Sequence, residues 1–327
     1  MATNKRIVVN RFGGPEVLEL IEEPVPKPKK NEVLIRNLVT GVAFGDIILR
    51  KGEAPFQKPP LTPGTEIVGI VKEAGSNVTT VKVGQLVAAL PFFGGYTEHI
   101  CLHQKELIPI PDGIDPKEAA SLVLNYLMAY QLLHRYAHVQ QGEKVLIHGA
   151  SGGIGTALLQ LGRIAEVEMF GTASQAKHAY VSSLGATPID YKNTDFVREI
   201  NKYHPDGMDV VFDCMGGRNF KKSYQILRKK GRVIGYGSGH LLPTLMTIMS
   251  RKFMPDGRKA SLYFLILSKK TKPHWFREDL NTLFEMLLNR TFQPVISQSY
   301  PLSEAKAAHE MLENGTVTGK ILLTMNP

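Results

Sequence analysis

The chain has 327 residues, 43% of them hydrophobic and 21% charged, which is the balance of a globular protein long enough for two domains. No run of 18 or more apolar residues occurs, which argues against a membrane-spanning helix, and the first residues lack the apolar core of a signal peptide. Only two cysteines are present, far apart, so no disulfide framework is indicated and we expect a cytoplasmic location. The net charge of +9 favours a surface that attracts anions over a nucleic-acid site, because no nucleic-acid motif accompanies it.

The first 115 residues are rich in Gly, Pro and short runs with strand-like alternation, which is typical of an irregular β-domain. The predicted strands are Lys5–Asn10, Glu32–Thr40, Glu66–Glu73, Leu86–Ala89 and Tyr96–Leu102. The pattern then changes at Asp115, which is followed by Pro116 and, three residues on, by Glu118. An N-cap residue, a proline at the first helical position and an acid in the first turn predict a helix over 119–135.

Between residues 144 and 236, apolar strand runs alternate with helical runs. The predicted strands are Lys144–His148, Val167–Thr172, Pro188–Asp190, Met208–Asp213 and Gly231–Tyr236. The predicted helices are Gly153–Ile164, Gln175–Leu184, Thr194–Tyr203 and Arg218–Leu227. Short apolar strands separated by helices predict a parallel sheet covered on both faces. Beyond Ser261 the chain becomes strand-like, then helical over 277–288 and 302–313, and ends in a strand over 319–324.

The stretch HGASGGIG, residues 148–155, joins the first of these strands to its helix. Glycines there allow a sharp turn and bring a ligand close to bare backbone, and the helix start attracts anions. We therefore predict a pyrophosphate site; the alternative is a plain strand-to-helix turn. The expected backbone donors are Ser151, Gly152, Gly153 and Ile154. A second loop, with Gly237 and Ser238, is expected beside a nicotinamide ribose, and its alternative is an ordinary strand-end turn.

Several longer stretches carry a family resemblance over essentially the whole chain. They are RFGGPEVLEL (11–20), PGTEIVGIVKEAGSNV (63–78), VGQLVAAL (83–90), LVLNYLMAYQLL (122–133), HGASGGIGTALLQL (148–161) and LGATPIDY (184–191). Together they resemble the zinc-free quinone oxidoreductase, or zeta-crystallin, branch of the medium-chain dehydrogenase/reductase superfamily. The middle part is also similar to vesicle amine transport proteins of that branch.

The resemblance implies an α/β fold in which a Rossmann doubly wound parallel sheet is inserted in a GroES-like irregular β-barrel domain. The expected parts are a substrate domain (1–118), an NADP-binding domain (119–258) and a return segment (259–327) that completes the substrate domain. A cleft between the domains is expected to hold the substrate. The resemblance also implies a homodimer that pairs an apolar edge strand near residues 258–267.

Zinc-bearing relatives use Cys, His or Glu, and Cys at the catalytic metal. Here the corresponding regions contain Ala43 and Thr65, and the structural-zinc region contains only Cys101. Zinc requires three or four converging nitrogen or sulfur ligands, so we predict no metal. His134 and His138 have a metal-ligand spacing but no evident third ligand, so they are interpreted as surface or packing residues.

The cofactor is predicted to be NADPH. In NAD-specific Rossmann domains an acid about 20 residues past the glycines binds the ribose hydroxyls, but residues 171–177 contain no Asp or Glu. Ser174 and Lys177 are placed to bind a 2′-phosphate, and the resemblance implies the same for Tyr191. The alternative is that Ser174 and Lys177 only cap an exposed helix start.

No motif indicates a nucleophile, a catalytic triad or a paired acid and base, so the catalytic residues are unknown. Hydride transfer fits this absence, because the cofactor carries that chemistry. Relatives often carry Asn at the position of Ala43 and Thr at the position of Met128, and both positions usually lie near the nicotinamide. Asn125 could partly substitute for these polar groups; the alternative is that it is a helix-surface amide. The candidate cleft residues are Ala43, Phe44, Phe92, Phe93, Tyr96 and Tyr263, the two tyrosines being either hydroxyl donors or packing aromatics.

The leading hypothesis is a zinc-independent, NADPH-dependent oxidoreductase that transfers hydride to a quinone or an α,β-unsaturated carbonyl. An enoyl-thioester reductase is disfavoured, because it would need a tyrosine acid in residues 41–56, which contain none. The alternative from another class is an NADP-binding protein of low catalytic activity that acts through a partner or nucleic acid. We expect a small electrophile and a second copy as partners and no membrane, and we disfavour nucleic acid.

Overall fold

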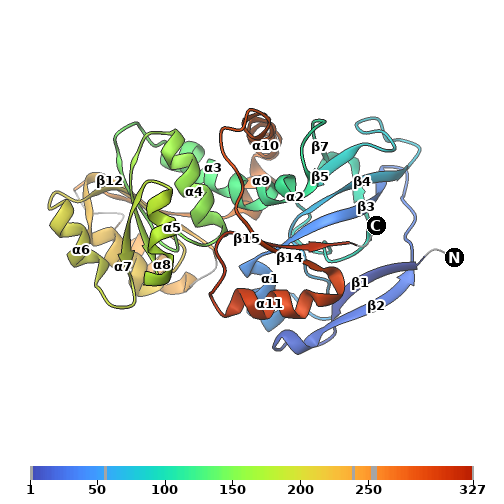
Figure 1. Cartoon of the computed structure of the whole chain (residues 1–327), viewed down its shortest axis with the longest axis horizontal. Helices are drawn as coiled ribbons and strands as arrows, with labels where there is room; N and C mark the ends of the chain where they lie inside the picture. Colours follow the sequence, from blue (N-terminus) through green and yellow to red (C-terminus); the bar gives the residue numbers. More distant parts are fainter. Residues whose placement is uncertain (1–2, 55–56, 238–239, 252–255, 326–327) are drawn as a thin grey trace. The chain divides into compact units, whose positions relative to one another are not determined.

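The computed structural model describes residues 3–54, 57–237, 240–251 and 256–325 (Figure 1). The chain forms two compact units, one of residues 1–124 with 280–327 and one of residues 125–279. The domain boundaries expected after residues 118 and 258 stay predictions, and we note that residues 259–279 belong to the second unit. Within the described ranges, no helix combines the length and the apolar character that crossing a membrane requires.

The first unit is built on a mostly antiparallel sheet with the order β14-β15-β3-β4-β5-β7, and β6 also pairs with β3. Its strands are β3 (Glu32–Val42), β4 (Ile67–Ala74), β5 (Leu86–Ala89), β6 (His99–His103), β7 (Ile108–Pro109), β14 (Ile296–Pro301) and β15 (Lys320–Thr324), beside a separate hairpin of β1 (Thr3–Val9) and β2 (Leu18–Pro24). Its helices are α1 (Phe44–Lys51), α2 (Pro116–Ser121) and α11 (Ala305–Glu313), and α10 (Pro273–Leu288) enters it. Strand β15 pairs with β3, so the last strand of the described chain joins the sheet that β3 begins (Figure 1).

The second unit contains the predicted parallel sheet, in the order β10-β9-β8-β11-β12-β13. Its strands are β8 (Lys144–Ile147), β9 (Glu168–Ala173), β10 (Ala186–Asp190), β11 (Met208–Asp213), β12 (Leu227–Tyr236) and β13 (Lys259–Tyr263). Its helices are α3 (Leu127–Tyr130), α4 (Gly153–Ile164), α5 (His178–Ser183), α6 (Phe196–Tyr203), α7 (Gly217–Gln225), α8 (Leu241–Arg251) and α9 (Leu265–Thr271). The order reverses between β8 and β11, which is where doubly wound sheets bind their ligands.

Apolar side chains of this sheet and its helices form one continuous core. Phe196 and Ile200 of α6 and Phe220 of α7 pack with Leu146 of β8 and Val211 of β11. Each such fully buried side chain contributes about 1.5–3 kcal/mol through the hydrophobic effect. This core fixes the carboxyl ends of β8, β9, β11 and β12, from which the candidate site is built.

Two sequence predictions need correction. The strand expected to run through residues 258–267 ends at Tyr263, and residues 265–267 begin helix α9 instead. The helix expected over 119–135 is interrupted, because α2 and α3 alternate with π-helical turns at Leu122–Tyr126 and Gln131–Ala137. Such turns widen the backbone locally and are frequent near functional sites.

Candidate functional site

The glycine-rich turn between β8 and α4 has the conformation that its sequence predicts. Gly149 has a φ of +68°, which L-residues adopt at a cost. A Cβ on Gly155 would lie 2.1 Å from the carbonyl oxygen of Gly149, so only glycine lets the helix approach the turn this closely. The N–H of Gly152 donates to the same oxygen at 3.0 Å and closes the turn.

Helix α4 begins at Gly153 with Gly152 in extended conformation before it. The first-turn N–H groups of Gly153, Ile154 and Gly155 have no acceptor inside the helix, because an α-helix leaves its first donors unpaired. Together with the helix dipole they form a site for an anion. Because the N–H of Gly152 is used within the turn, these three groups are the donors that α4 offers.

A buried histidine fastens this turn to the neighbouring strands. His148 Nε2 lies 3.0 Å from Ser223 Oγ, and that hydroxyl donates to Asp213 Oδ2 at 2.7 Å. Since a carboxylate only accepts, Ser223 receives its hydrogen bond from His148 Nε2–H. The other ring nitrogen, Nδ1, therefore accepts from Thr172 Oγ1 at 3.2 Å, and Thr172 in turn accepts the N–H of Gly149. Burial lowers the pKa of His148, in keeping with a neutral ring.

The loops after β11 and β12 lie at the same edge as the glycine turn. The Sγ of Cys214 and the hydroxyl of Tyr236 donate to the carbonyl oxygen of His148 at 3.3 and 3.4 Å. Gly237 is exposed and has a φ of +86°, whereas the predicted Ser238 lies outside the described residues. The sequence pattern predicted the glycines but not His148, Ser223 and Asp213. His148 and Asp213 are polar residues at the ends of buried strands, which is a weak signal, and Ser223 lies within α7.

The predicted 2′-phosphate residues follow β9 and β10. The hydroxyl of Ser174 caps no N–H, although Ser174 stands at an N-cap position, and Lys177 is half-buried. Burial lowers the pKa of Lys177, and the positive charge of Lys192 acts in the same direction. Tyr191 is exposed. The carboxylate of Asp190 at the end of β10 is bonded to the N–H of Lys192 and to Asn193, at 3.0 and 2.6 Å.

Asn125 and Met128 occupy the irregular helix before the sheet. Asn125 is buried, and its side-chain Nδ2 lies 2.4 Å from where a Cβ on Gly153 would stand. The interpretation of Asn125 as a helix-surface amide is therefore wrong, because the amide packs on the first residue of α4. Met128 is also buried.

In the first unit, Asp46 joins the two regions that hold metal ligands in zinc-bearing relatives. Its Oδ2 accepts the N–H of Ala43 at 2.8 Å, and its Oδ1 accepts the N–H of Gly64 at 2.9 Å and the hydroxyl of Thr65 at 3.2 Å. Burial raises the pKa of Asp46 to about 6, and the charge of Glu66 adds to this effect.

Candidate cleft residues gather around these groups. Phe44 is the first residue of α1 and is 64% exposed, and Phe93 is also exposed. Phe92 has a φ of +69°, a conformation that is strained for a bulky residue, and its N–H donates to the carbonyl oxygen of Thr65 at 3.0 Å. The structure thus brings Ala43, Phe44 and Phe92 to one neighbourhood around Asp46 and Thr65.

Tyr96 and Tyr263 are packed inside their own units. The hydroxyl of Tyr96 lies 3.0 Å from Nε2 of the buried His309, and that of Tyr263 donates to Gln131 Oε1 at 2.7 Å. Both tyrosines are fully buried. These contacts favour the alternative in which the two residues are packing aromatics.

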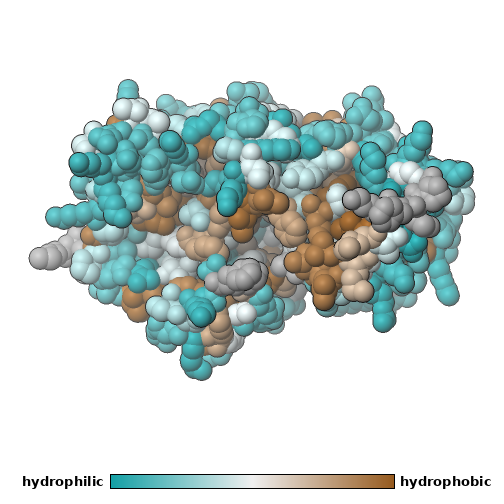
Figure 2. All heavy atoms as spheres, turned by 180° about the vertical axis from the view of Figure 1, so that it is seen from behind, coloured by the Kyte–Doolittle hydropathy of each residue, from teal (hydrophilic) through white to brown (hydrophobic). Residues whose placement is uncertain are grey.

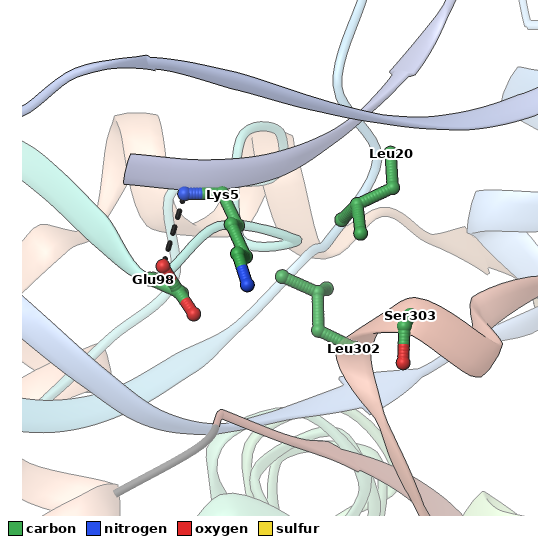
Figure 3. A pocket seen from close by; sticks show the side chains of 5 residues that line it. All are labelled: Lys5, Leu20, Glu98, Leu302 and Ser303. Atoms are coloured by element: carbon green, nitrogen blue, oxygen red, sulfur yellow. Dashed lines mark hydrogen bonds between the residues drawn. The ribbon is translucent and has the colours of Figure 1, made fainter. Parts of the chain in front are cut away.

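A small hollow of the first unit lies away from these residues. It measures about 100 Å³ and is lined by Lys5, Leu20, Glu98, Leu302 and Ser303, with the N–H of Lys5 donating to Glu98 at 3.0 Å (Figure 3). Ligand pockets usually measure about 300–1,000 Å³. This hollow contains none of the predicted site residues.

The residues present do not fit a zinc ion. Ala43 offers no ligand atom, and Thr65 offers a hydroxyl that is bonded to Asp46. In the described part of the chain, no group of three or more His, Cys, Asp or Glu side chains could hold a metal. The ring of His134 packs against that of Tyr130 in a tilted arrangement, with ring centroids 4.5 Å apart. The absence of zinc stays a prediction.

Comparison with known proteins agrees with this architecture. The family model "Alcohol dehydrogenase GroES-like domain" matches residues 29–112, and "Zinc-binding dehydrogenase" matches residues 184–323. A quinone oxidoreductase from Pongo abelii is 31% identical over 337 residues, which cover 99% of this chain and all of that protein. The chain belongs to the quinone oxidoreductase and VAT-1 branch of the medium-chain dehydrogenase/reductase superfamily. The predicted family and the predicted GroES-like and Rossmann fold class are thereby confirmed.

The chain is also similar to VAT-1 proteins and to solved structures of quinone oxidoreductases. The "Synaptic vesicle membrane protein VAT-1 homolog" of Danio rerio is 30% identical over 342 residues, covering 99% of this chain and 71% of that protein. The crystal structure of Escherichia coli quinone oxidoreductase complexed with NADPH has a TM-score of 0.91 and 28% identity, and the match covers 99% of this chain and all of that one.

Proposed function

We propose that this protein binds NADPH and reduces a quinone or an α,β-unsaturated carbonyl. The observation that carries the proposal is the glycine turn at Gly149–Gly155, which leaves the start of α4 open at the switch point of the parallel sheet. The related E. coli oxidoreductase, whose structure is a complex with NADPH, supports the choice of cofactor.

Each predicted cofactor residue receives a role under this proposal. Bound NADPH supplies a hydride to the substrate. The N–H groups of Gly153 and Ile154 hold the pyrophosphate, and Ser151 borders it. Ser174, Lys177 and Tyr191 hold the 2′-phosphate. Asn125, Met128 and Gly237 border the nicotinamide half.

The site keeps the substrate in place and away from water. Ala43, Phe44 and Phe93 provide an apolar wall for a planar π-system, and Asp46 positions this wall by binding the N–H of Ala43. The reduced substrate anion takes a proton from water or from a nearby hydroxyl. Simple alcohol oxidation is disfavoured, because the described residues include no zinc ligand set that could stabilise an alkoxide.

The test is NADPH oxidation, followed by absorbance, with a panel of quinones and enones. We expect turnover with at least one class. NADPH binding without turnover of any panel member would overturn the catalytic part and favour the second candidate, an NADP-binding protein that acts through a partner. The apolar residues Ala43 and Met128, where relatives often carry polar groups, are the observation that favours this candidate.

We further propose a cytoplasmic homodimer. The sheet of the second unit has β13 at one edge, and Phe264, Ile266 and Leu267 are exposed directly after it. Pairing of β13 with a second copy would satisfy its open backbone groups and cover these side chains.

A further inference from the structure

The hydroxyl of Thr65 connects the buried carboxyl group of Asp46 with the surface of the first unit. Two hydroxyls donate to this carboxyl group, that of Thr65 to Oδ1 at 3.2 Å and that of Tyr96 to Oδ2 at 3.4 Å. Tyr96 is fully buried, whereas Thr65 is half-buried. Of these two groups, the Thr65 hydroxyl is therefore the one that can meet a bound molecule.

The surroundings of Thr65 are apolar. Phe44 begins α1, two positions before Asp46, and is 64% exposed. The carbonyl oxygen of Thr65 accepts the N–H of Phe92, and the next residue, Phe93, is exposed. Apolar side chains reach the surface elsewhere too, as the brown patches show on the side of the molecule drawn in Figure 2. A planar substrate that covers these rings would exclude water, so the proton for the reaction would have to come from the protein.

The carboxyl group of Asp46 can hold a proton near neutral pH. Two cations of its surroundings are engaged with other acids, since Lys320 is paired with Glu66, and Arg50, on the same helix as Asp46, is paired with Glu313. Burial raises the pKa of Asp46 to about 6, and the negative charge of Glu66 adds to this effect, while two backbone N–H groups and Lys320 oppose it. Near pH 6 the carboxyl group can therefore both hold and release a proton.

The other side of Asp46 is closed by a chain of hydrogen bonds with a fixed direction. A guanidinium group only donates, so Arg50 Nη1 donates to His309 Nδ1, 3.3 Å away. His309 Nε2–H then donates to the hydroxyl oxygen of Tyr96 at 3.0 Å, and Tyr96 donates to Asp46. Burial lowers the pKa of His309 to about 3, so this ring is neutral and has no extra proton to give. The remaining route for the proton of Asp46 leads through Thr65.

We propose that Thr65 donates the proton to the reduced substrate and that Asp46 resupplies it. This inference rests on the proposed reductase function. While Asp46 is ionised, the hydroxyl of Thr65 points its hydrogen at Oδ1. Once Asp46 is protonated, its Oδ1–H group donates to Thr65 Oγ1, and the hydrogen of Thr65 turns toward the substrate.

The step balances in atoms and charge. After hydride addition the substrate is an enolate or a hydroquinone anion. Its oxygen binds the proton of Thr65 as the Oγ1–H bond breaks, and Oγ1 takes the proton of Asp46 Oδ1, which becomes a carboxylate. Solvent protonates Asp46 again after the product has left. A lone hydroxyl is a weak acid, but in this coupled transfer the carboxyl group is the acid that ends up ionised, which makes the transfer favourable.

The test measures kcat and KM of the wild type, Thr65→Val and Thr65→Ser with a quinone or an enone that the wild type reduces. We expect kcat of Thr65→Val to fall about a hundredfold, the usual contribution of a general acid, with little change in KM and with rescue by Thr65→Ser. The control is Thr247→Val, because that hydroxyl donates to the carbonyl oxygen of Pro243 within α8. The wild-type kcat should fall as the pH rises above about 6, and Asp46→Asn should lack this dependence.

Urea unfolding gives a second readout that does not need the reaction. The hydroxyl of Thr65 stabilises the ionised form of Asp46, so its removal should raise the pKa of Asp46 further. The loss of stability with rising pH that Asp46 causes should then extend to higher pH in Thr65→Val than in Thr65→Ser. Circular dichroism and an NADPH titration show whether each variant keeps its fold.

The outcomes separate this inference from the reductase function. A wild type that reduces a substrate, together with an unchanged kcat in Thr65→Val, would overturn the role of Thr65 and leave the reductase function standing. A kcat that is equally low in Thr65→Val and Thr65→Ser would also contradict a proton-donating hydroxyl. A wild type that reduces no quinone or enone would overturn both.

Discussion

The Nε2–H group of His148 donates a hydrogen bond to Ser223 Oγ, 3.0 Å away, and the hydroxyl of Ser223 donates in turn to Asp213. The first unit repeats this arrangement with other residues. His309 lies 3.0 Å from the hydroxyl of Tyr96, which is 3.4 Å from Asp46. In both units a buried neutral histidine reaches a buried aspartate through a hydroxyl group, and each aspartate also accepts backbone N–H groups of a candidate site loop. These networks hold loops in place and need no bound group to do so.

The first prediction concerns the close approach at the glycine turn. In Gly155→Ala the new methyl would meet the carbonyl oxygen of Gly149, so α4 must move from the turn and its N–H groups with it. We expect NADPH affinity to fall at least about tenfold, about 1.4 kcal/mol, as measured by fluorescence titration. The control is Gly45→Ala, because a Cβ there meets nothing within 4 Å. Unchanged affinity in Gly155→Ala would contradict the site.

How much of this site the sequence could predict depends on the range of the interactions. Helix α4 has the predicted bounds, Gly153–Ile164, because glycines, an anion-binding start and an apolar run all act locally. The partnership of His148 with Ser223 joins residues 75 positions apart, and no local pattern encodes it. Helix α8 was missed because its apolar residues face outward, so the usual amphipathic contrast is absent. Strand β13 was predicted too long because its apolar run continues into α9.

The second prediction is a pH dependence of stability with two opposing contributions. Burial, aided by the charge of Arg50, lowers the pKa of His309 to about 3. The unfolded chain takes up this proton near pH 6.5, so the stabilisation is complete above pH 6.5 and is lost as the pH falls toward 3. The pKa of Asp46 is instead raised to about 6, so its contribution is greatest below pH 3.8 and is lost as the pH rises toward 6.

Between pH 4 and 6 the two contributions have opposite slopes, each at most about 1.4 kcal/mol per pH unit. In His309→Gln, which keeps an acceptor for Arg50 and a donor for Tyr96, the loss of stability on acidification should be smaller. In Asp46→Asn the loss of stability on acidification should be steeper than in the wild type. Urea unfolding midpoints measured across this range check both slopes. Parallel pH profiles for the wild type and His309→Gln would show that the histidine does not titrate as described.

The third prediction is that the purified protein holds no stoichiometric zinc and that its activity resists chelators. Ala43 and Thr65 occupy positions where zinc-bearing relatives have ligands, and no other residue nearby replaces them. That statement applies to the described residues. Elemental analysis before and after dialysis against a chelator checks it, and loss of zinc together with activity would contradict it.

The fourth prediction is a homodimer at micromolar concentration that depends on β13. Ser261→Pro, in the middle of the strand, removes a backbone donor and should weaken pairing across an open edge. Static light scattering measures the molecular mass of the wild type and of the variant. Ser250→Pro is not a suitable control, because a proline there would break α8. A better control is Ser76→Pro, in an exposed turn of the first unit. A monomeric wild type would rule the dimer out.

The fifth prediction is a preference for NADPH over NADH that depends on Lys177. The residues from Gly171 to Lys177 contain no carboxylate to repel a 2′-phosphate, and the nearby Asp190 is engaged by Lys192 N–H and Asn193. Lys177 and Lys192 are close enough for the charge of one to lower the pKa of the other, so an anion placed between them gains from both.

Lys177→Glu replaces this attraction with repulsion and should weaken NADPH binding by about 1–3 kcal/mol, the range of a charge-assisted hydrogen bond, while NADH binding changes much less. Lys202→Glu is the matched control, because Lys202 is exposed on α6 and paired with Glu199 at 2.7 Å. Fluorescence titrations of the wild type and both variants with each cofactor decide the matter. Equal affinity of the wild type for NADPH and NADH, or equal losses of affinity for both cofactors in Lys177→Glu, would contradict the assignment of a 2′-phosphate site at Lys177.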